Sequence, residues 1–346
     1  MDIILKISQE LMCRQEQVAA AVKLIDEGCT IPFIARYRKE ATGSLNDEQL
    51  RTLDERLTYL RGLEDRKEKV IASIEEQGML TDELKKSILA AETLVAVEDL
   101  YRPYKPKRKT RATIAQSKGL TGLANIISLQ MTNKPIPEEA LAYVSEEKEV
   151  HSAEEAIAGA MDIIAESISD NAEYRTEIRS LTMDKGILMT TAKDPEAESV
   201  YEMYYDFSTP VRKMTGYRTL AINRGEKEKF LSVKIEAPVD EITGYLIRQV
   251  IVRDNPNTND ILRNTITDSY ERLIAPSIER DIRSSLTEAA EDGAIKVFGS
   301  NLKQLLMQPP INGHVVLGWD PAFRTGCKLA VVDATGKVLD TKVIYP

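Results

Sequence analysis

The stretch "NDEQLRTLDERLTYLRGLEDRKEKVIASIEEQ" (Asn46–Gln77) is the longest periodic segment of the chain. Its leucines recur three or four positions apart, at Leu50, Leu53, Leu57 and Leu60. That spacing places them on one face of an α-helix, which would be about 48 Å long over these residues. Asn46 and Gln49 form a capping-box pattern at its start, and Gly78 is a typical helix stop. Because only one face is apolar, we predict a helix that packs within the molecule rather than a dimer zipper.

Helical patterns continue on both sides of this segment, so we predict a mainly α fold with a multi-helix N-terminal region over residues 1–308. Residues 15–43 predict two helices separated by a short turn at Gly28, a helix-turn-helix-like arrangement that an ordinary antiparallel helix pair also fits. Three basic residues, Arg36, Arg38 and Lys39, fall on the second predicted helix. They are candidates for nucleic-acid contact, and a solvated helix face is the alternative.

Composition narrows the classes of function. The chain has 346 residues, a net charge of −9, three cysteines and two histidines. These few thiols and imidazoles do not cluster at zinc-ligand spacing, so we expect reduced cysteines, no metal site and no cofactor. There is no stretch long and apolar enough to span a membrane and no signal-peptide pattern, which favours a cytoplasmic protein without membrane contact. No phosphate-binding glycine loop or nucleophile elbow occurs, and we expect a protein that is not an enzyme.

A basic segment nevertheless interrupts this acidic chain. Residues 101–118, "YRPYKPKRKTRATIAQSK", contain no acidic residue and seven basic ones. Pro103 and Pro106 predict a loop of extended backbone that holds the cations apart. Such a loop could follow a phosphate backbone or bind an acidic protein surface, and we expect Tyr101 and Tyr104 to anchor it to the helices. The candidate binding residues here are Arg102, Lys105, Lys107, Arg108, Lys109 and Arg111.

A β-hairpin is predicted over about residues 217–237. In "RTLAINRGEKEKFLSVKIEAP" (Arg218–Pro238) two β-like runs flank a polar turn at 224–229. The aromatic residues that precede it, from Tyr201 to Tyr217, are expected to pack the hairpin against helices.

The sequence pattern of residues 309–346 predicts a different fold from the helical region before it. "QPPING" (Gln308–Gly313) indicates a linker, assigned to residues 309–313. Residues 314–346 then predict three strands in a meander, the arrangement with which an RNase H-like α/β domain begins. Asp320 ends the first strand at the position of an acidic residue of such nucleases, but two-metal chemistry needs several carboxylates. We therefore interpret Asp320 as vestigial, and Asp333 as a structural turn residue.

Four long stretches carry a resemblance to a known family: "TIPFIARYRKEATGSL" (Thr30–Leu45), "VEDLYRPYKPKRKTRATIA" (Val97–Ala115), "YYDFSTPVRKMTGYRTLAINRGEKE" (Tyr204–Glu228) and "VLGWDPAFRTGCKLAVVD" (Val316–Asp333). Together and in this order they resemble the Tex family of bacterial transcription accessory proteins. The resemblance implies a cytoplasmic, mostly helical nucleic-acid-binding protein. It also implies a YqgF-type RNase H-like domain, of which residues 314–346 would be the incomplete start, so we expect the chain to be the N-terminal portion of a longer protein.

The leading hypothesis is therefore a non-catalytic, Tex-like transcription accessory factor that binds RNA or DNA. Partners implied by the resemblance are RNA polymerase or ribosome-associated proteins. Two alternatives remain open: a RuvC-like metal-dependent nuclease in the full-length protein, suggested by Asp320, and a protein-interaction scaffold, suggested by the acidic charge and exposed helical faces. The sequence leaves open the preference between RNA and DNA, the genes or complexes affected and the oligomeric state.

Overall fold

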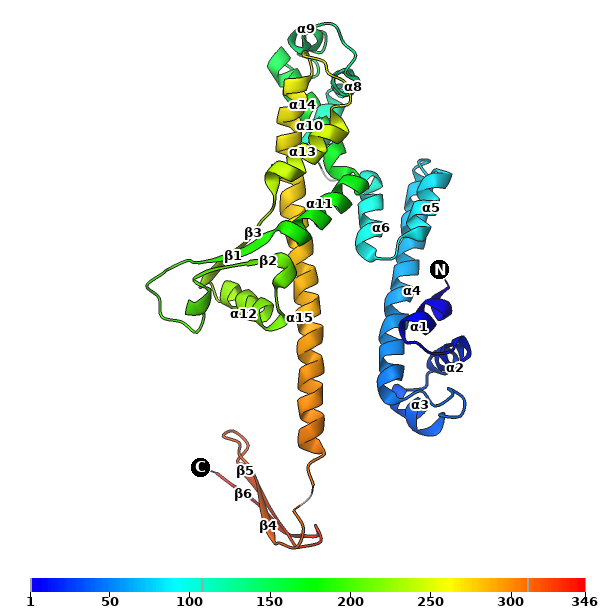
Figure 1. The fold of residues 1–346 in the computed structure, drawn as a ribbon, viewed down its shortest axis with the longest axis vertical. Coiled ribbons are helices and arrows are strands. Elements are labelled where there is room, and N and C mark those ends of the chain that lie inside the picture. Colours follow the sequence, from blue (N-terminus) through cyan, green and yellow to red (C-terminus); the bar gives the residue numbers. More distant parts are fainter. Residues whose placement is uncertain (1, 107–108, 310, 346) are drawn as a thin grey trace. The chain divides into compact units, whose positions relative to one another are not determined.

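The computed structural model describes residues 2–106, 109–309 and 311–345. Its contacts divide the chain into two compact units, Met1–Met214 with Ala221–Ser285, and Thr215–Leu220 with Leu286–Pro346. Helices dominate the described residues, which confirms the predicted mainly α class (Figure 1). None of the helices in this described part of the chain is long and apolar enough to cross a membrane.

The first unit begins with six helices around one core: α1 (Ile3–Glu10), α2 (Gln15–Asp26), α3 (Ile31–Tyr37), α4 (Asp47–Glu76), α5 (Asp82–Ala90) and α6 (Leu94–Tyr101). The predicted long helix is confirmed as α4, with both capping-box bonds between Asn46 and Gln49. Its predicted leucine face is at most 3% exposed and forms the centre of the core. Figure 1 shows α3 beside the start of α4 and α6 nearer its other end.

The turn between α2 and α3 depends on Gly28, whose φ of +84° lies in the left-handed region that favours glycine. The N–H of Gly28 bonds to the Ile25 carbonyl and that of Cys29 to the Leu24 carbonyl, the paired closure of a Schellman motif. The second helix is shorter than expected: α3 ends at Tyr37, so Arg36 is helical while Arg38 caps the helix and Lys39 lies in the following turn.

The expectation of an extended loop over 101–118 is wrong for most of its length. Pro103 lies inside a 3₁₀ helix, η1 (Arg102–Tyr104), and α7 (Arg111–Ser117) begins only a few residues later. Proline fits the first turn of a helix because the N–H it lacks has no partner there. A capping box between Thr110 and Thr113 starts α7. The described residues between the two helices, 105, 106, 109 and 110, belong to neither helix nor strand.

The rest of the first unit surrounds α10. Its helices are α8 (Thr121–Leu129), α9 (Ile136–Leu141), α10 (Ala153–Asp170), α11 (Ala172–Lys185), α13 (Val239–Val250), α14 (Asn259–Asp268) and the π-helix η4 (Ser269–Ile274), which leads into α15 (Ala275–Leu306). α15 is a continuous helix of 32 residues. Short 3₁₀ turns occur at η2 (Glu202–Tyr204) and η3 (Val211–Lys213).

The predicted hairpin at 217–237 is also wrong. Its first half is a helix, α12 (Gly216–Lys227), and its second half is strand β3 (Leu231–Glu236). β3 pairs with the distant β1 (Ile187–Ala192), which also pairs with β2 (Asp206–Pro210), in an antiparallel sheet of order β2-β1-β3. Gly225 allows α12 to approach closely, because a Cβ there would lie 2.7 Å from the Leu231 side chain.

The second unit contains the start of α12, the later part of α15 and three strands. These are β4 (Val316–Asp320), β5 (Cys327–Val332) and β6 (Val338–Ile344), and they form the predicted meander with β5 in the centre. Gly326 makes the tight entry to β5 possible, since its φ is +76° and a Cβ would meet Val343 at 2.6 Å. Between α15 and β4, no helix or strand is assigned to the described residues.

Candidate nucleic-acid interface

The first group of candidate residues lies where α3 ends. Ile34 and Ala35 are buried against the core, which turns Arg36 outward together with Arg38 and Lys39. In the described part of the chain, no carboxylate forms an ion pair with any of these three cations. Their charges are therefore available to an anionic ligand.

The backbone that carries these cations is well fixed. The Arg38 carbonyl accepts hydrogen bonds from the N–H groups of Ala41 and Thr42, each at 3.1 Å, and the Lys39 carbonyl accepts from Ser44 N–H at 2.8 Å. Gln17 of α2 donates its side-chain amide to the Gly43 carbonyl at 2.8 Å. The turn after α3 is thus closed by local bonds and tied to the neighbouring helix.

Two aromatic residues that the sequence analysis did not consider lie among these cations. Phe33 and Tyr37, one turn apart on α3, have ring centroids 5.4 Å apart with an interplanar angle of 46°. The guanidinium of Arg38 lies 5.2 Å from the Phe33 centroid, within cation–π range. The sequence already contained the pattern that predicts this pair, because aromatic residues four positions apart share a helix face.

The second group of candidates follows α6. Lys105, Lys109 and Arg111 are exposed, with Lys105 Nζ 3.6 Å from a carboxylate oxygen of Glu98. Arg111 is the first residue of α7. Two other candidates, Lys107 and Arg108, lie outside the described residues.

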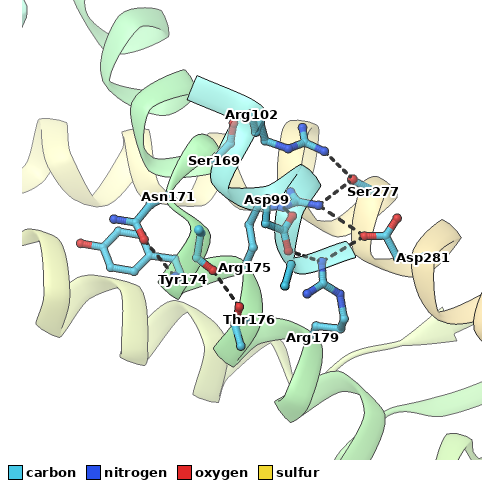
Figure 2. Close-up of polar contacts among 12 residues, drawn as sticks. Asp99, Arg102, Ser169, Asn171, Tyr174, Arg175, Thr176, Arg179, Ser277 and Asp281 are labelled. Carbon is cyan, nitrogen blue, oxygen red and sulfur yellow. Dashed lines mark hydrogen bonds and ion pairs between the residues drawn. The ribbon is translucent and has the colours of Figure 1, made fainter. Parts of the chain in front are cut away.

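Arg102 differs from the rest of this group because it is turned into the protein. Its Nη2 donates to Ser277 Oγ at 3.3 Å (Figure 2). Burial, and then the nearby charge of Arg175, lower the pKa of the Arg102 guanidinium. Arginine stays protonated in any case. Because its guanidinium is bonded to Ser277 inside the protein, this side chain anchors the segment and does not present its charge to solvent.

Arg102 borders a buried network of charged residues from three helices. Asp99 of α6 accepts 2.7 Å bonds from Arg175 Nε and Arg179 Nη2 of α11, as Figure 2 shows. Asp281 of α15 accepts longer bonds from the same two arginines, at 3.4 and 3.2 Å. The network therefore fixes the end of α6, from which the basic segment leaves, against α11 and α15.

The donors of this network outnumber its acceptors. Among the described residues, the buried atoms Arg175 Nη1 and Arg179 Nε have no hydrogen-bond partner. Arg175 is also bonded to Ser277 Oγ at 2.9 Å. A buried donor without a partner lowers the free energy of unfolding, so loss of any acceptor of this network, such as Asp99, should destabilise the fold.

Tyr101 anchors the segment to α4, as expected, and Tyr104 packs partly buried against the same core. Tyr101 is 7% exposed, and its hydroxyl lies 3.0 Å from Ser73 Oγ. Gln77 donates its side-chain amide to the Tyr104 carbonyl at 3.0 Å. Both contacts lie near the end of α4 and hold the start of the basic segment there, whereas α7, which carries Arg111, packs against α10.

The structure does not bring the two basic groups together. The first lies directly before Asn46, where α4 begins, and the second is attached at Ser73 and Gln77. At 1.5 Å per residue, α4 separates these points by about 40 Å. A ligand would have to be extended to contact both groups.

The aromatic group before the predicted hairpin is only partly as expected: Tyr201 and Tyr204 pack inside the first unit, but the hairpin is absent and Tyr217 is 65% exposed. Tyr201 and Tyr204 are at most 5% exposed. Tyr201 lies against Phe230, with centroids 5.8 Å apart, and Tyr204 meets Phe207 edge-on. These rings are not accessible to a ligand.

Asp320 is the last residue of β4 and is exposed, opposite Lys328 of β5. Within the described ranges, no three His, Cys, Asp or Glu side chains are grouped closely enough to hold a metal ion. Asp333 has a structural environment: its Oδ1 accepts from the N–H groups of Thr335 and Lys337. The Thr335 hydroxyl also donates to Asp333 Oδ1, at 2.8 Å. This bond, followed by the two backbone bonds, lowers the pKa of the Asp333 carboxyl.

Three family models match the chain in order: the Tex-like protein N-terminal domain over residues 1–75, the Tex central region-like model over 131–298, and the Tex protein YqgF-like domain over 314–346. The uncharacterized protein YdcI of Bacillus subtilis is 51% identical over 344 residues, covering 99% of this chain and 48% of the relative. The transcriptional accessory protein Tex of Neisseria gonorrhoeae is 41% identical over 355 residues, covering 100% of this chain and 46% of the relative.

A human relative, S1 RNA-binding domain-containing protein 1, is 31% identical over 345 residues, which cover 94% of this chain and 34% of the relative. The chain thus spans about half the length of the bacterial relatives it matches and about a third of the human one. Three consecutive family models and similarity along nearly the whole chain agree with the four stretches noted in the sequence. The chain belongs to the Tex family of transcription accessory proteins.

Proposed function

We propose that this chain binds nucleic acid through the two basic groups at the ends of α4, as a non-catalytic part of a transcription accessory factor. The observation that carries the proposal is the set of exposed cations: Arg36, Arg38, Lys39, Lys105, Lys109 and Arg111. Five of the six have no ion-pair partner among the described residues, and Lys105 has one long contact. The names of the relatives, one a transcriptional accessory protein and one an S1 RNA-binding domain-containing protein, support the same role.

The overall charge of −9 does not oppose this role. Exposed charges farther apart than the Debye length, about 8 Å at physiological salt, are largely screened from one another. A phosphate backbone therefore responds to the charges close to it, which around the second group include Glu98 beside Lys105 and the carboxyl groups of Asp162 and Asp268 near Arg111. Because the cations are local, charge-neutralising substitutions can test them group by group.

Salt dependence provides the test. If all six cations contact phosphates of a single strand, the logarithm of the binding constant falls with the logarithm of salt with a slope of about −4. We would titrate a labelled oligouridylate of about 30 nucleotides, long enough to reach both groups, between roughly 50 and 200 mM salt. The variants Arg36→Gln/Lys39→Gln and Lys109→Gln/Arg111→Gln should each bind more weakly and reduce the slope by about 1.4.

The matched control is Lys85→Gln/Lys86→Gln, which removes two exposed charges from α5. It should leave both the affinity and the slope unchanged. Absence of binding by the unmodified chain at low salt, or a slope that none of these substitutions changes, would contradict the proposal.

We further propose that Asp320 takes no part in catalysis. Two-metal hydrolysis needs several carboxylates that converge on ions about 4 Å apart, whereas Asp320 stands opposite a lysine at the end of β4. Cleavage of RNA or DNA by the full-length protein in Mg²⁺ or Mn²⁺ that disappears in Asp320→Asn would show the nuclease alternative to be correct.

A further inference from the structure

We propose that Tyr37, supported by Phe33 and Arg38, is a stacking platform for an unpaired base, so that the α3 end of the chain takes single-stranded nucleic acid. This inference rests on the proposed function and adds the class of ligand. The supporting observation is the coincidence of an exposed ring pair and three cations without carboxylate partners on one short element.

The geometry leaves Tyr37 accessible and Phe33 supporting it. Tyr37 is 61% exposed and Phe33 36% exposed. Arg38 covers Phe33 through the cation–π contact, and its Nη1 also donates to the Tyr37 carbonyl at 3.1 Å. Phe33 is therefore in contact with both the Tyr37 ring and the Arg38 guanidinium, while most of Tyr37 is exposed to solvent.

The surrounding charges suit a nucleotide strand. A base stacks on an aromatic face whatever its identity, and the phosphates on either side of it require cations. Arg36 and Lys39 are next to Tyr37 along the chain and are exposed. The hydrogen-bonded turn from Arg38 to Ser44 fixes the backbone on which these side chains are mounted, which limits the entropy lost when a strand binds.

A purely structural role accounts for only part of the arrangement. An i, i+4 aromatic pair stabilises a helix, and Phe33 contributes to packing at the edge of the core. That role does not require the ring of Tyr37 to be mostly in solvent, nor three cations without carboxylate partners beside it. Tyr201 and Tyr204, whose role is packing, are at most 5% exposed.

The ligand class follows from the accessibility of the bases. In a duplex, both faces of each base are covered by its neighbours, whereas a single strand can present an unstacked base to a ring. The platform should therefore act on single strands and contribute nothing to binding of a duplex of equal length.

The experiment combines substitutions in the chain with removal of bases from the ligand. The 346-residue chain is titrated with oligouridylate, with an oligomer of the same length that lacks bases, and with a duplex of that length. Tyr37→Ala should weaken oligouridylate binding about tenfold, a typical effect for one stacked base, and leave the other two affinities unchanged. Tyr37→Phe keeps the ring and should bind like the unmodified chain, while Tyr37→Leu keeps apolar area without a π face and should resemble Tyr37→Ala.

Tyr217→Ala is the matched control, because Tyr217 is 65% exposed and also has an arginine, Arg218, near its ring. It should bind all three oligomers normally. The inference is overturned if Tyr37→Ala binds oligouridylate normally or if it binds the base-free oligomer as weakly as it binds oligouridylate. It is also overturned if Tyr37→Leu binds oligouridylate as tightly as the unmodified chain. Such results with an intact salt slope would leave the proposed function standing, whereas loss of all binding by the unmodified chain would remove both.

Discussion

Replacing Asp99 by alanine should destabilise the first unit strongly. Asp99 is 5% exposed and accepts two charge-assisted bonds of 2.7 Å, one of them from Arg175, which is 1% exposed. Bonds to charged groups contribute about 1.5–3 kcal/mol each, and breaking a buried ion pair costs about 3–5 kcal/mol. Because Arg175 Nη1 already has no partner among the described residues, we expect the free energy of unfolding to fall by about 4 kcal/mol.

Two further variants make the expectation quantitative. Asp281 is 34% exposed and its bonds are longer, so Asp281→Ala should have a smaller effect, about 1–2 kcal/mol. Asp65 of α4 pairs with Lys69, and both side chains are more than half exposed, so Asp65→Ala should change stability by less than about 0.5 kcal/mol.

Thermal and urea unfolding followed by circular dichroism would measure this series. At about 2.1 cal/mol/K of unfolding entropy per residue, a change of 4 kcal/mol corresponds to a melting temperature lower by about 7 °C for a unit of about 280 residues. The double variant Asp99→Leu/Arg175→Met removes both buried charges and should be less destabilised than Asp99→Ala alone. If Asp99→Ala unfolds like Asp65→Ala, or if the double variant is as unstable as Asp99→Ala, the network does not hold the helices as described.

Two other predictions concern pH and packing. Bonds from Arg56 lower the pKa of the Glu10 carboxyl in the folded chain, so the pair contributes up to about 1 kcal/mol above about pH 4.5 and loses it as the pH falls through the folded pKa. The melting temperatures of Glu10→Gln and the unmodified chain should therefore differ at neutral pH and converge in acid. A Cβ added at Gly62 in α4 meets open space, so Gly62→Ala should raise the free energy of unfolding by about 0.5–1 kcal/mol. A Cβ at Gly225 would lie 2.7 Å from the Leu231 side chain, so Gly225→Ala should lower the free energy of unfolding by about 1–3 kcal/mol. Urea unfolding measures both, and a change of the same sign in the two variants would contradict the close packing of α12.

The parts of the fold that depend on local signals could be predicted. The capping box at Asn46, the leucine spacing of α4 and the left-handed glycine at Gly28 act over a few residues, and each is present in the structure. The hairpin at 217–237 failed because β3 pairs with β1, some 40 residues earlier, and a short apolar run such as Leu220–Ile222 fits a helix as well as a strand.

The sequence pointed to the basic residues of the candidate site, but it did not predict the buried charge network that positions the second basic group. An isolated Asp99 or Arg179 on an amphipathic helix looks like an ordinary solvated charge, and their pairing is set by helices far apart in the sequence. Arg175 carried a usable signal, because it shares the buried face of α11 with Ile178 and Thr182. An arginine on an apolar face needs a buried partner, and searching for one would have led towards this network.

The length of α4 has a consequence for avidity. If the two basic groups bind nucleic acid as proposed, the second contact becomes intramolecular only when the strand is long enough to reach it. At about 3.4 Å per stacked nucleotide, a separation of about 40 Å corresponds to roughly a dozen nucleotides. If both groups bind one strand as proposed, affinity should rise in a step near that length rather than smoothly.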